Sequence, residues 1–143
     1  MSTGQRKINQ DSFIAVTNLG GERFDRHLFG VYDGHGSNGH YVSNFVKEHL
    51  PSTPLSKLLC FNFLHSIIAL LLNDRNLYRN PPLALINSYD ICHKKLMMSE
   101  IDVKFSGTTA ITILIVGDKV ISANAGDSRA IMGKLSKGIP VII

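Results

Sequence analysis

Three adjacent residues, Asp33, Gly34 and His35, follow an apolar run and offer a carboxylate, a backbone without a side chain and an imidazole. The apolar run at 27–32 predicts a strand, and the residues at 37–50 predict a helix. A carboxylate oxygen from Asp33 and the backbone carbonyl of Gly34 suit a hard metal ion, and His35 can transfer a proton beside it. We therefore take this strand end as the first candidate functional site.

Two further groups of polar residues fall beside predicted strands. Arg6 precedes Gln10 and Asp11, and its planar guanidinium matches two oxygens of a phosphate group. Asp127 follows a later strand, and carboxylates suit Mg²⁺ or Mn²⁺, which prefer oxygen ligands. His35 can act as a general acid toward a leaving alkoxide, and a metal-activated water makes a Ser or Cys nucleophile unnecessary. Together these residue types predict phosphoryl chemistry.

Each of these groups also has a plainer interpretation. Taken alone, Arg6 is an ordinary solvated side chain, Asp33 an ordinary turn or helix-cap residue, and His35 an ordinary loop residue. Asp127, within a Gly-Asp-Ser sequence, is most simply part of a hairpin turn. The hydroxyl-bearing residues at 106–109 are most simply the opening of a strand, and we assign them that role alone.

The first half of the chain predicts two strands followed by helices. Residues 12–17 predict a strand that pairs antiparallel, across a Gly20-Gly21 turn, with the strand that ends at Asp33. The helix expected at 37–50 ends before a proline. A further helix is expected at 83–99, and the residues that share its apolar face are Leu85, Tyr89, Cys92 and Leu96.

The second half of the chain predicts a three-stranded antiparallel meander. Residues 108–116 are rich in β-branched side chains and are followed by Gly117-Asp118, which favours a two-residue type II′ hairpin. Residues 119–125 return as the second strand. The Gly126-Asp127 turn then leads into a third expected strand at 128–132.

Composition limits the class of protein. The chain has 143 residues, enough for one domain, and its 44% apolar and 18% charged residues are typical of a globular protein. The net charge of +4 comes from scattered Lys and Arg residues, which argues against nucleic-acid binding. Cys60 and Cys92 are expected to be core thiols in a reducing compartment. The apolar stretch at 55–72 carries Lys57 and predicts a buried helix in preference to a membrane span.

Four segments, taken in order, resemble the metal-dependent protein phosphatases, the type 2C serine/threonine family. They are GQRKINQDSF at 4–13, FGVYDGHGSNG at 29–39, FSGTTA at 105–110 and ANAGDSRA at 123–130. The resemblance implies an α+β fold in which two antiparallel β-sheets pack as a sandwich with flanking helices (α-β-β-α), and we expect this arrangement to be incomplete in this chain.

The resemblance also implies a set of metal ligands. Asp33 would bridge two Mg²⁺ or Mn²⁺ ions, and Gly34 would offer its backbone carbonyl to one of them. Gln10 stands where relatives have Glu or Gln, so it would hydrogen-bond or coordinate weakly. Asp127 stands where the family has an acidic residue linked to a third, weaker metal site. The expected cofactors are therefore two Mg²⁺ or Mn²⁺ ions and a third ion held more weakly.

The implied reaction is hydrolysis of phosphoserine and phosphothreonine in proteins by a metal-activated water at a dinuclear site. Arg6 would bind the substrate phosphate, Asp11 would orient water, and His35 would protonate the departing Ser or Thr oxygen. The expected partners are phosphorylated proteins, with no nucleic acid and no membrane. The first ten residues are polar and contain no signal peptide, so we expect a cytoplasmic or nuclear location.

The match has a gap on its C-terminal side. In the family, two further metal-ligand aspartates come from a later part of the domain, whereas this sequence has no Asp after Asp127 and no Trp. We therefore expect residues 1–143 to form a single phosphatase-like domain truncated on its C-terminal side, with 55–82 as a candidate insertion. Two alternatives stay open at this point: a non-catalytic phosphatase-like binding or regulatory module, and an inactive fragment.

Overall fold

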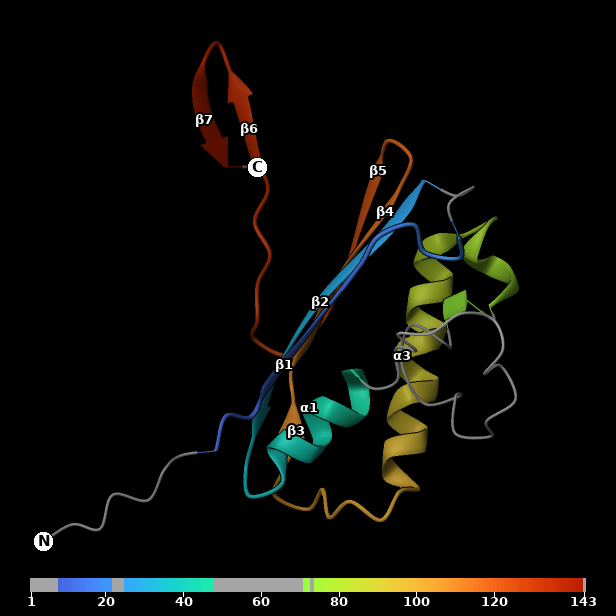
Figure 1. Cartoon of the computed structure of the whole chain (residues 1–143), viewed down its shortest axis with the longest axis vertical. Coiled ribbons are helices and arrows are strands. Elements are labelled where there is room, and N and C mark those ends of the chain that lie inside the picture. The colour runs from blue at the N-terminus through green and yellow to red at the C-terminus, as the bar shows by residue number, and fades with distance from the viewer. Residues whose placement is uncertain (1–7, 22–24, 48–70, 73, 143) are drawn as a thin grey trace, which may run out of the picture.

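The computed structural model describes residues 8–21, 25–47, 71–72 and 74–142. Its elements, in chain order, are β1 (Asp11–Val16), β2 (Arg26–His35), α1 (Gly39–Lys47), the 3₁₀ helix η2 (Arg75–Leu77), α3 (Pro81–Met97), β3 (Gly107–Thr108), β4 (Ala110–Val116), β5 (Lys119–Ala125), β6 (Gly133–Ser136) and β7 (Ile139–Ile142). Figure 1 shows α1 and α3 on the same side of the larger sheet, with the β6–β7 hairpin standing away from it.

The larger sheet is antiparallel throughout. Its strands lie in the order β1-β2-β4-β5, and β3 pairs with the end of β2. The β4 and β5 strands are joined by the predicted two-residue turn, since Val116 pairs with Lys119. A second antiparallel sheet consists of β6 and β7 alone. The prediction of an α+β fold with two antiparallel sheets and flanking helices is therefore confirmed.

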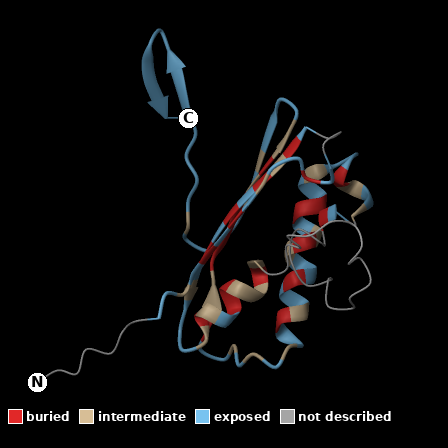
Figure 2. Ribbon diagram, in the orientation of Figure 1, coloured by how far each residue is buried: buried red, intermediate tan, exposed pale blue. Residues whose placement is uncertain are grey.

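Alternating burial along β1 and β2 assigns one face of the larger sheet to the helices. Ile14 and Tyr32 are buried, whereas Phe13 and Val31, which point to the opposite face, are 68% and 50% exposed. In Figure 2 every residue of the β6–β7 hairpin is exposed. Among the described residues the small sheet therefore does not cover the open face, and the two sheets do not pack face to face.

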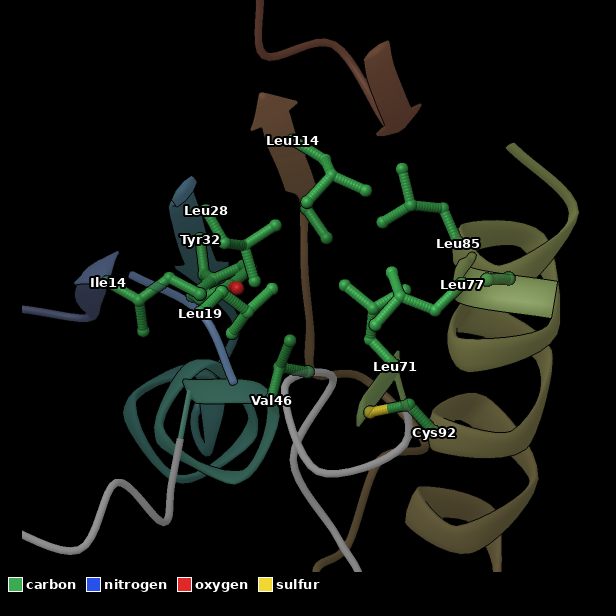
Figure 3. Packing of buried hydrophobic residues seen from close by; sticks show 12 residues of the cluster. Ile14, Leu19, Leu28, Tyr32, Val46, Leu71, Leu77, Leu85, Cys92 and Leu114 are labelled. Carbon is green, nitrogen blue, oxygen red and sulfur yellow. The ribbon is translucent and has the colours of Figure 1, made fainter. Parts of the chain in front are cut away.

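The hydrophobic core fills the space between the larger sheet and α3, as Figure 3 shows. Leu28 and Leu114 of the sheet are fully buried with Leu85 of α3, and each such side chain contributes about 2 kcal/mol by leaving water. Burial raises the pKa of the Cys92 thiol to about 11, which fits the predicted core thiol. Cys60 lies outside the described residues.

A hydroxyl group fastens α3 to the middle of the sheet. The Tyr89 hydroxyl lies 3.0 Å from the Thr112 Oγ1 and donates to the backbone oxygen of Ala123 at 3.1 Å. These contacts satisfy polar atoms that would otherwise be buried without partners. Burial is also the main cause that raises the pKa of the Tyr89 phenol.

The helix predicted at 83–99 is observed as α3, Pro81–Met97. It begins earlier because Asn80 caps it, with its Oδ1 accepting a hydrogen bond from the Leu83 backbone N–H at 3.3 Å, and because prolines are tolerated in a first turn. Its predicted apolar face is confirmed by the burial of Leu85, Cys92 and Leu96. The helix expected at 37–50 is observed as Gly39–Lys47, and 48–50 lie outside the described residues.

The prediction of a third meander strand at 128–132 is wrong. Residues 128–132 have no regular secondary structure, and the next strand, β6, begins at Gly133 and pairs with β7. The chain leaves the sheet at Gly126, whose φ is +104°, so the antiparallel path does not continue. The Lys137-Gly138 turn then closes a separate hairpin, with positive φ at both residues, as a type I′ turn requires.

The apolar stretch at 55–72 lies outside the described residues except for its last two. Of these two, Leu71 belongs to the buried core. None of the helices in the described part of the chain is both long enough and apolar enough to cross a membrane.

Candidate functional site

The carboxylates of Asp11 and Asp33 meet at the end of the β1–β2 pair. The two residues are direct cross-strand partners, and both are exposed. Strand alternation places their side chains together on the open face of the sheet, with a spacing of about 5 Å between Cβ atoms. Neither carboxylate forms an ion pair with another described residue. The structure therefore brings two of the predicted site residues together, and their mutual repulsion favours a cation between them.

The backbone at Gly34 is packed closely between Gln10 and the start of α1. A Cβ on Gly34 would collide with the carbonyl oxygens of Gly39 and Gln10, so no side chain fits there. The Gln10 Nε2 donates to the Gly36 backbone oxygen at 2.9 Å, whereas its Oε1 is buried and accepts no hydrogen bond from the described residues. An unsatisfied buried oxygen costs about 1–3 kcal/mol, which a coordinated cation would recover.

The His35 imidazole is exposed at the end of β2. Its ring lies against Gly107, where a Cβ would stand 2.8 Å from the His35 Nε2. His35 also lines a cavity of about 360 Å³ whose other walls come mainly from apolar side chains, among them Val42 and Leu96. The cavity is walled by residues of α1, α3 and the helix-covered side of the sheet, whereas Asp11 and Asp33 lie on the open face. An exposed imidazole is accessible to solvent and is a common proton donor and acceptor.

Residues 105–109, here called the buttress segment, hold residues 33–38, here called the Asp33 loop. The Ser106 Oγ accepts a hydrogen bond from the Asn38 backbone N–H at 2.9 Å, just before α1 begins. Gly107 and Thr108 form β3 and pair with His35 and Gly34. The Asp33 loop is therefore fixed along its whole length by a segment that lies about 70 residues further along the chain.

Thr109 completes the buttress segment at Asp33. Its backbone N–H donates to the Asp33 carbonyl oxygen at 2.8 Å, and its Oγ1 accepts from the Asp33 backbone N–H at 3.1 Å. The residues at 106–109 predicted only the opening of a strand, so the positioning role of Ser106 and Thr109 could not be foreseen from that pattern. The run of hydroxyl-bearing residues was the available signal, because such residues form side-chain to backbone hydrogen bonds at strand and helix ends.

The remaining predicted site residues stand further away or outside the described residues. Asp127 is exposed and directly follows the end of β5 and Gly126. The described residues contain no group of three or more His, Cys, Asp or Glu side chains close enough to hold a metal ion, so Asp127 does not join Asp11 and Asp33 in one cluster. Arg6 lies outside the described residues.

The oxygen atoms at this strand end fit a hard divalent cation. Within the described part of the chain, the Asp11 and Asp33 carboxylates form no ion pair and the Gln10 Oε1 accepts no hydrogen bond. Oxygen atoms of these kinds are the ligands that Mg²⁺ and Mn²⁺ take, and both ions retain several waters. The set contains no sulfur and supplies only two closely spaced carboxylates, so by itself it forms an open and incomplete site.

Comparisons with known proteins agree with this geometry. The family model described as protein phosphatase 2C matches residues 2–141. A probable protein phosphatase 2C 35 of Arabidopsis thaliana is 40% identical over 126 residues, which cover 88% of this chain and 31% of that protein. A probable protein phosphatase 2C 64 of Oryza sativa subsp. japonica is 33% identical over 136 residues, which cover 91% of this chain and 28% of that protein.

The alignment is therefore nearly complete for this chain and partial for its relatives. The chain spans about a third of the length of the curated relatives that it matches. The Asp33 loop, the buttress segment and Asp127 all fall within the matched residues. On the extent of this match, the chain belongs to the protein phosphatase 2C family.

Proposed function

We propose that this chain supplies the Asp33 side of a metal-dependent site that hydrolyses phosphoserine and phosphothreonine in proteins. The observation that carries the proposal is the cross-strand pair of Asp11 and Asp33, which has no cationic partner among the described residues. Membership of the protein phosphatase 2C family supports the reaction class. The exposed position of the pair leaves room for a phosphorylated peptide.

The proposed ligands of the metal are the Asp33 carboxylate, the Gly34 carbonyl oxygen and the Gln10 amide oxygen, with Asp127 contributing to a weaker site. Bound Mg²⁺ or Mn²⁺ would supply Lewis acidity toward phosphate and would lower the pKa of water. The chemical preference of both ions for oxygen supports this assignment. Gly34 suits its role because a residue without a side chain lets its backbone come close to a ligand.

The other proposed roles fall to residues that bind substrate or move protons. Arg6 binds two oxygens of the substrate phosphate through its planar guanidinium. Asp11 accepts a hydrogen bond from water and orients it toward phosphorus. The exposed His35 donates a proton to the departing Ser or Thr oxygen, which would otherwise leave as an alkoxide.

Charge counting predicts weak metal binding by residues 1–143. Asp11, Asp33 and Asp127 together carry −3, whereas two divalent ions carry +4. Only Asp11 and Asp33 are close neighbours. We therefore expect slow Mn²⁺-dependent hydrolysis by this chain, and a fast rate would contradict the charge argument.

Release of phosphate from a phosphothreonine peptide in Mn²⁺ tests the proposal. Asp33→Asn should reduce the Mn²⁺-dependent rate at least tenfold, which corresponds to about 1.4 kcal/mol or more of transition-state stabilisation. Asp118→Asn, in the turn at the opposite end of the sheet, is the matched control and should leave the rate unchanged. More than a tenth of the normal rate in Asp33→Asn would contradict the assignment.

His35→Gln provides a second arm of this experiment. An aryl phosphate has a good leaving group and needs little help from an acid, so its hydrolysis should fall less than that of the phosphopeptide. Equal losses on both substrates would remove His35 from the role of acid.

A non-catalytic phosphatase-like module is the second candidate function. The observation that favours it is the lack of a three-carboxylate cluster in the described part of the chain. Phosphopeptide binding that Arg6→Ala abolishes, without any Mn²⁺-dependent phosphate release, would support this module over the enzyme.

A further inference from the structure

Thr109 contacts Asp33 through two hydrogen bonds. Its backbone N–H donates to the Asp33 carbonyl oxygen, and its Oγ1 accepts from the Asp33 backbone N–H. The side chain is 9% exposed, so these bonds are shielded from competing water. Both backbone hydrogen-bonding groups of Asp33, its N–H and its carbonyl oxygen, therefore bond to Thr109.

The same side chain reaches the residues 126–128, here called the Asp127 loop. The Thr109 Oγ1 lies 2.6 Å from the Ser128 Oγ, a short hydrogen bond between hydroxyl groups. The Thr109 methyl group lies directly beneath Gly126, where an added Cβ would stand 2.9 Å from the Thr109 Cγ2. Thr109 therefore contacts the residues on both sides of Asp127.

A hydroxyl group is suited to this double contact. It has one donor proton and two acceptor lone pairs, so the Thr109 Oγ1 can accept from Asp33 and bond to Ser128 at the same time. The β-branched methyl group fixes the side-chain rotamer and fills the space below Gly126. Serine could supply the hydroxyl without the methyl, and valine could supply the shape without the hydroxyl.

We propose that Thr109 is a positioning residue that couples the backbone of Asp33 to the Asp127 loop. When the backbone at Asp33 is fixed, the Thr109 hydroxyl is fixed with it, and its hydrogen bond to Ser128 then restricts the Asp127 loop. The coupling is a property of the fold, and its use in metal binding rests on the proposed function. The two can therefore be tested separately.

Three variants separate coupling from general stability. Thr109→Val removes the hydroxyl and retains the shape, whereas Thr109→Ser retains the hydroxyl. Thr112→Val is the matched control, because Thr112, on β4, is buried as Thr109 is, but its hydroxyl bonds to Tyr89, at the helix-covered face. Thr109→Val loses the hydroxyl contacts with Asp33 and Ser128, and Thr112→Val loses the contact with Tyr89, so both variants should lower thermal stability, Thr109→Val somewhat more.

The first measurement is the rate of amide hydrogen exchange at Asp33, monitored by NMR. In Thr109→Val the Asp33 N–H should exchange about tenfold faster, because its acceptor is gone, and Thr109→Ser and Thr112→Val should retain protection. Ser128→Ala should shift the Asp33 amide resonance in the wild-type chain and leave it unchanged in the Thr109→Val background. Protection of Asp33 that is unaffected by Thr109→Val, or lost equally in Thr112→Val, would overturn the proposal.

The second measurement is the Mn²⁺ dissociation constant, obtained from the signal of free Mn²⁺ in electron paramagnetic resonance. We expect Thr109→Val to weaken binding about tenfold and Thr109→Ser and Thr112→Val to stay within about threefold of wild type. Equal weakening by both valine variants would assign Thr109 a structural role only. If wild-type chain binds no Mn²⁺, the proposed function fails, and the exchange measurement alone decides whether Thr109 couples the two segments.

Discussion

The two segments that carry predicted metal ligands differ in how they are held. The Asp33 loop is fixed from residue 33 to residue 38 by the backbone and hydroxyl groups of the buttress segment. The Asp127 loop leaves the sheet after β5, and its described side-chain contact with the rest of the site is the Thr109–Ser128 hydrogen bond. Beyond it the chain has no regular structure until Gly133, and Figure 2 shows the β6–β7 hairpin exposed throughout.

This difference separates a preorganised half of the site from a half that depends on other contacts. Several hydrogen bonds along one loop act together, so the Asp33 carboxylate projects from a backbone that has little freedom left to lose when a ligand binds. The Asp127 carboxylate projects from a segment with far fewer contacts, and ordering it on binding costs conformational entropy.

The largest effect is expected from alanine at Gly36, compared with alanine at Gly138. Both glycines have a positive φ, +83° and +79°. A Cβ on Gly36 would collide with the Phe105 carbonyl oxygen and stand 2.7 Å from the Ser106 Cα, whereas a Cβ on Gly138 would meet nothing within 4 Å. Gly36→Ala should cost about 3 kcal/mol or more of unfolding free energy, and Gly138→Ala only the backbone cost of about 1 kcal/mol.

Urea unfolding of the two variants measures this difference, with the slope of the transition checked for constancy. Gly133→Ala is the matched control, since Gly133 has an ordinary φ and open space around it, and it should behave like wild type. Equal losses for Gly36→Ala and Gly138→Ala would show that the buttress segment does not confine the Asp33 loop.

The strand that ends at Asp33 and the buried face of α3 could be predicted from the sequence, because local patterns of residues determine them. The apolar run before Asp33 predicted the strand, and the helical spacing of Leu85, Cys92 and Leu96 predicted the buried face of α3. The pairing of Asp11 with Asp33 follows from a hairpin between neighbouring strands. Each of these features depends on residues that are close in sequence or on a periodicity that can be counted.

The roles of Ser106 and Thr109 could not be predicted in this way. Their partners, Asn38 and Asp33, are 68 and 76 residues away in sequence, so no local pattern reports the contact. The prediction of a third meander strand at 128–132 was wrong for a related reason. Residues 128–132 do not pair with any strand, whereas the next strand, β6, pairs with β7, and the Ser128 Oγ lies 2.6 Å from the Thr109 Oγ1, a tertiary contact that no local pattern reports.

The second prediction compares the two carboxylates in Mn²⁺ binding. Asp33→Asn should weaken binding about 30-fold, or about 2 kcal/mol, because it removes a charge from a rigid position beside Asp11. Asp127→Asn should weaken binding only about threefold, because much of what its charge contributes is offset by the entropy of ordering its loop. The dissociation constants follow from titration with the free-ion signal of Mn²⁺.

Asp118→Asn carries the same change in charge at the opposite end of the sheet and controls for long-range electrostatics. It should leave the dissociation constant within experimental error of wild type. A larger loss for Asp127→Asn than for Asp33→Asn would reverse the ranking of the two segments and would place the stronger ligand on the less confined loop.

The smallest effect is expected from removing one hydroxyl of the buttress segment. The Ser106 Oγ accepts the Asn38 backbone N–H at the start of α1, and Ser106 is buried, so Ser106→Ala should cost about 1 kcal/mol of unfolding free energy. Ser136→Ala makes the same change on the exposed strand β6 and should stay within about 0.5 kcal/mol of wild type.

Hydrogen exchange at the Asn38 amide distinguishes a local from a general effect of Ser106→Ala. The amide should lose protection in that variant and keep it in Ser136→Ala, since the hydroxyl is its acceptor in the described structure. If Asn38 stays protected while the whole chain loses stability, Ser106 supports the core and not the loop. Loss of protection at Asn38 with little loss of global stability would instead show that each hydroxyl of the buttress segment holds its own part of the Asp33 loop.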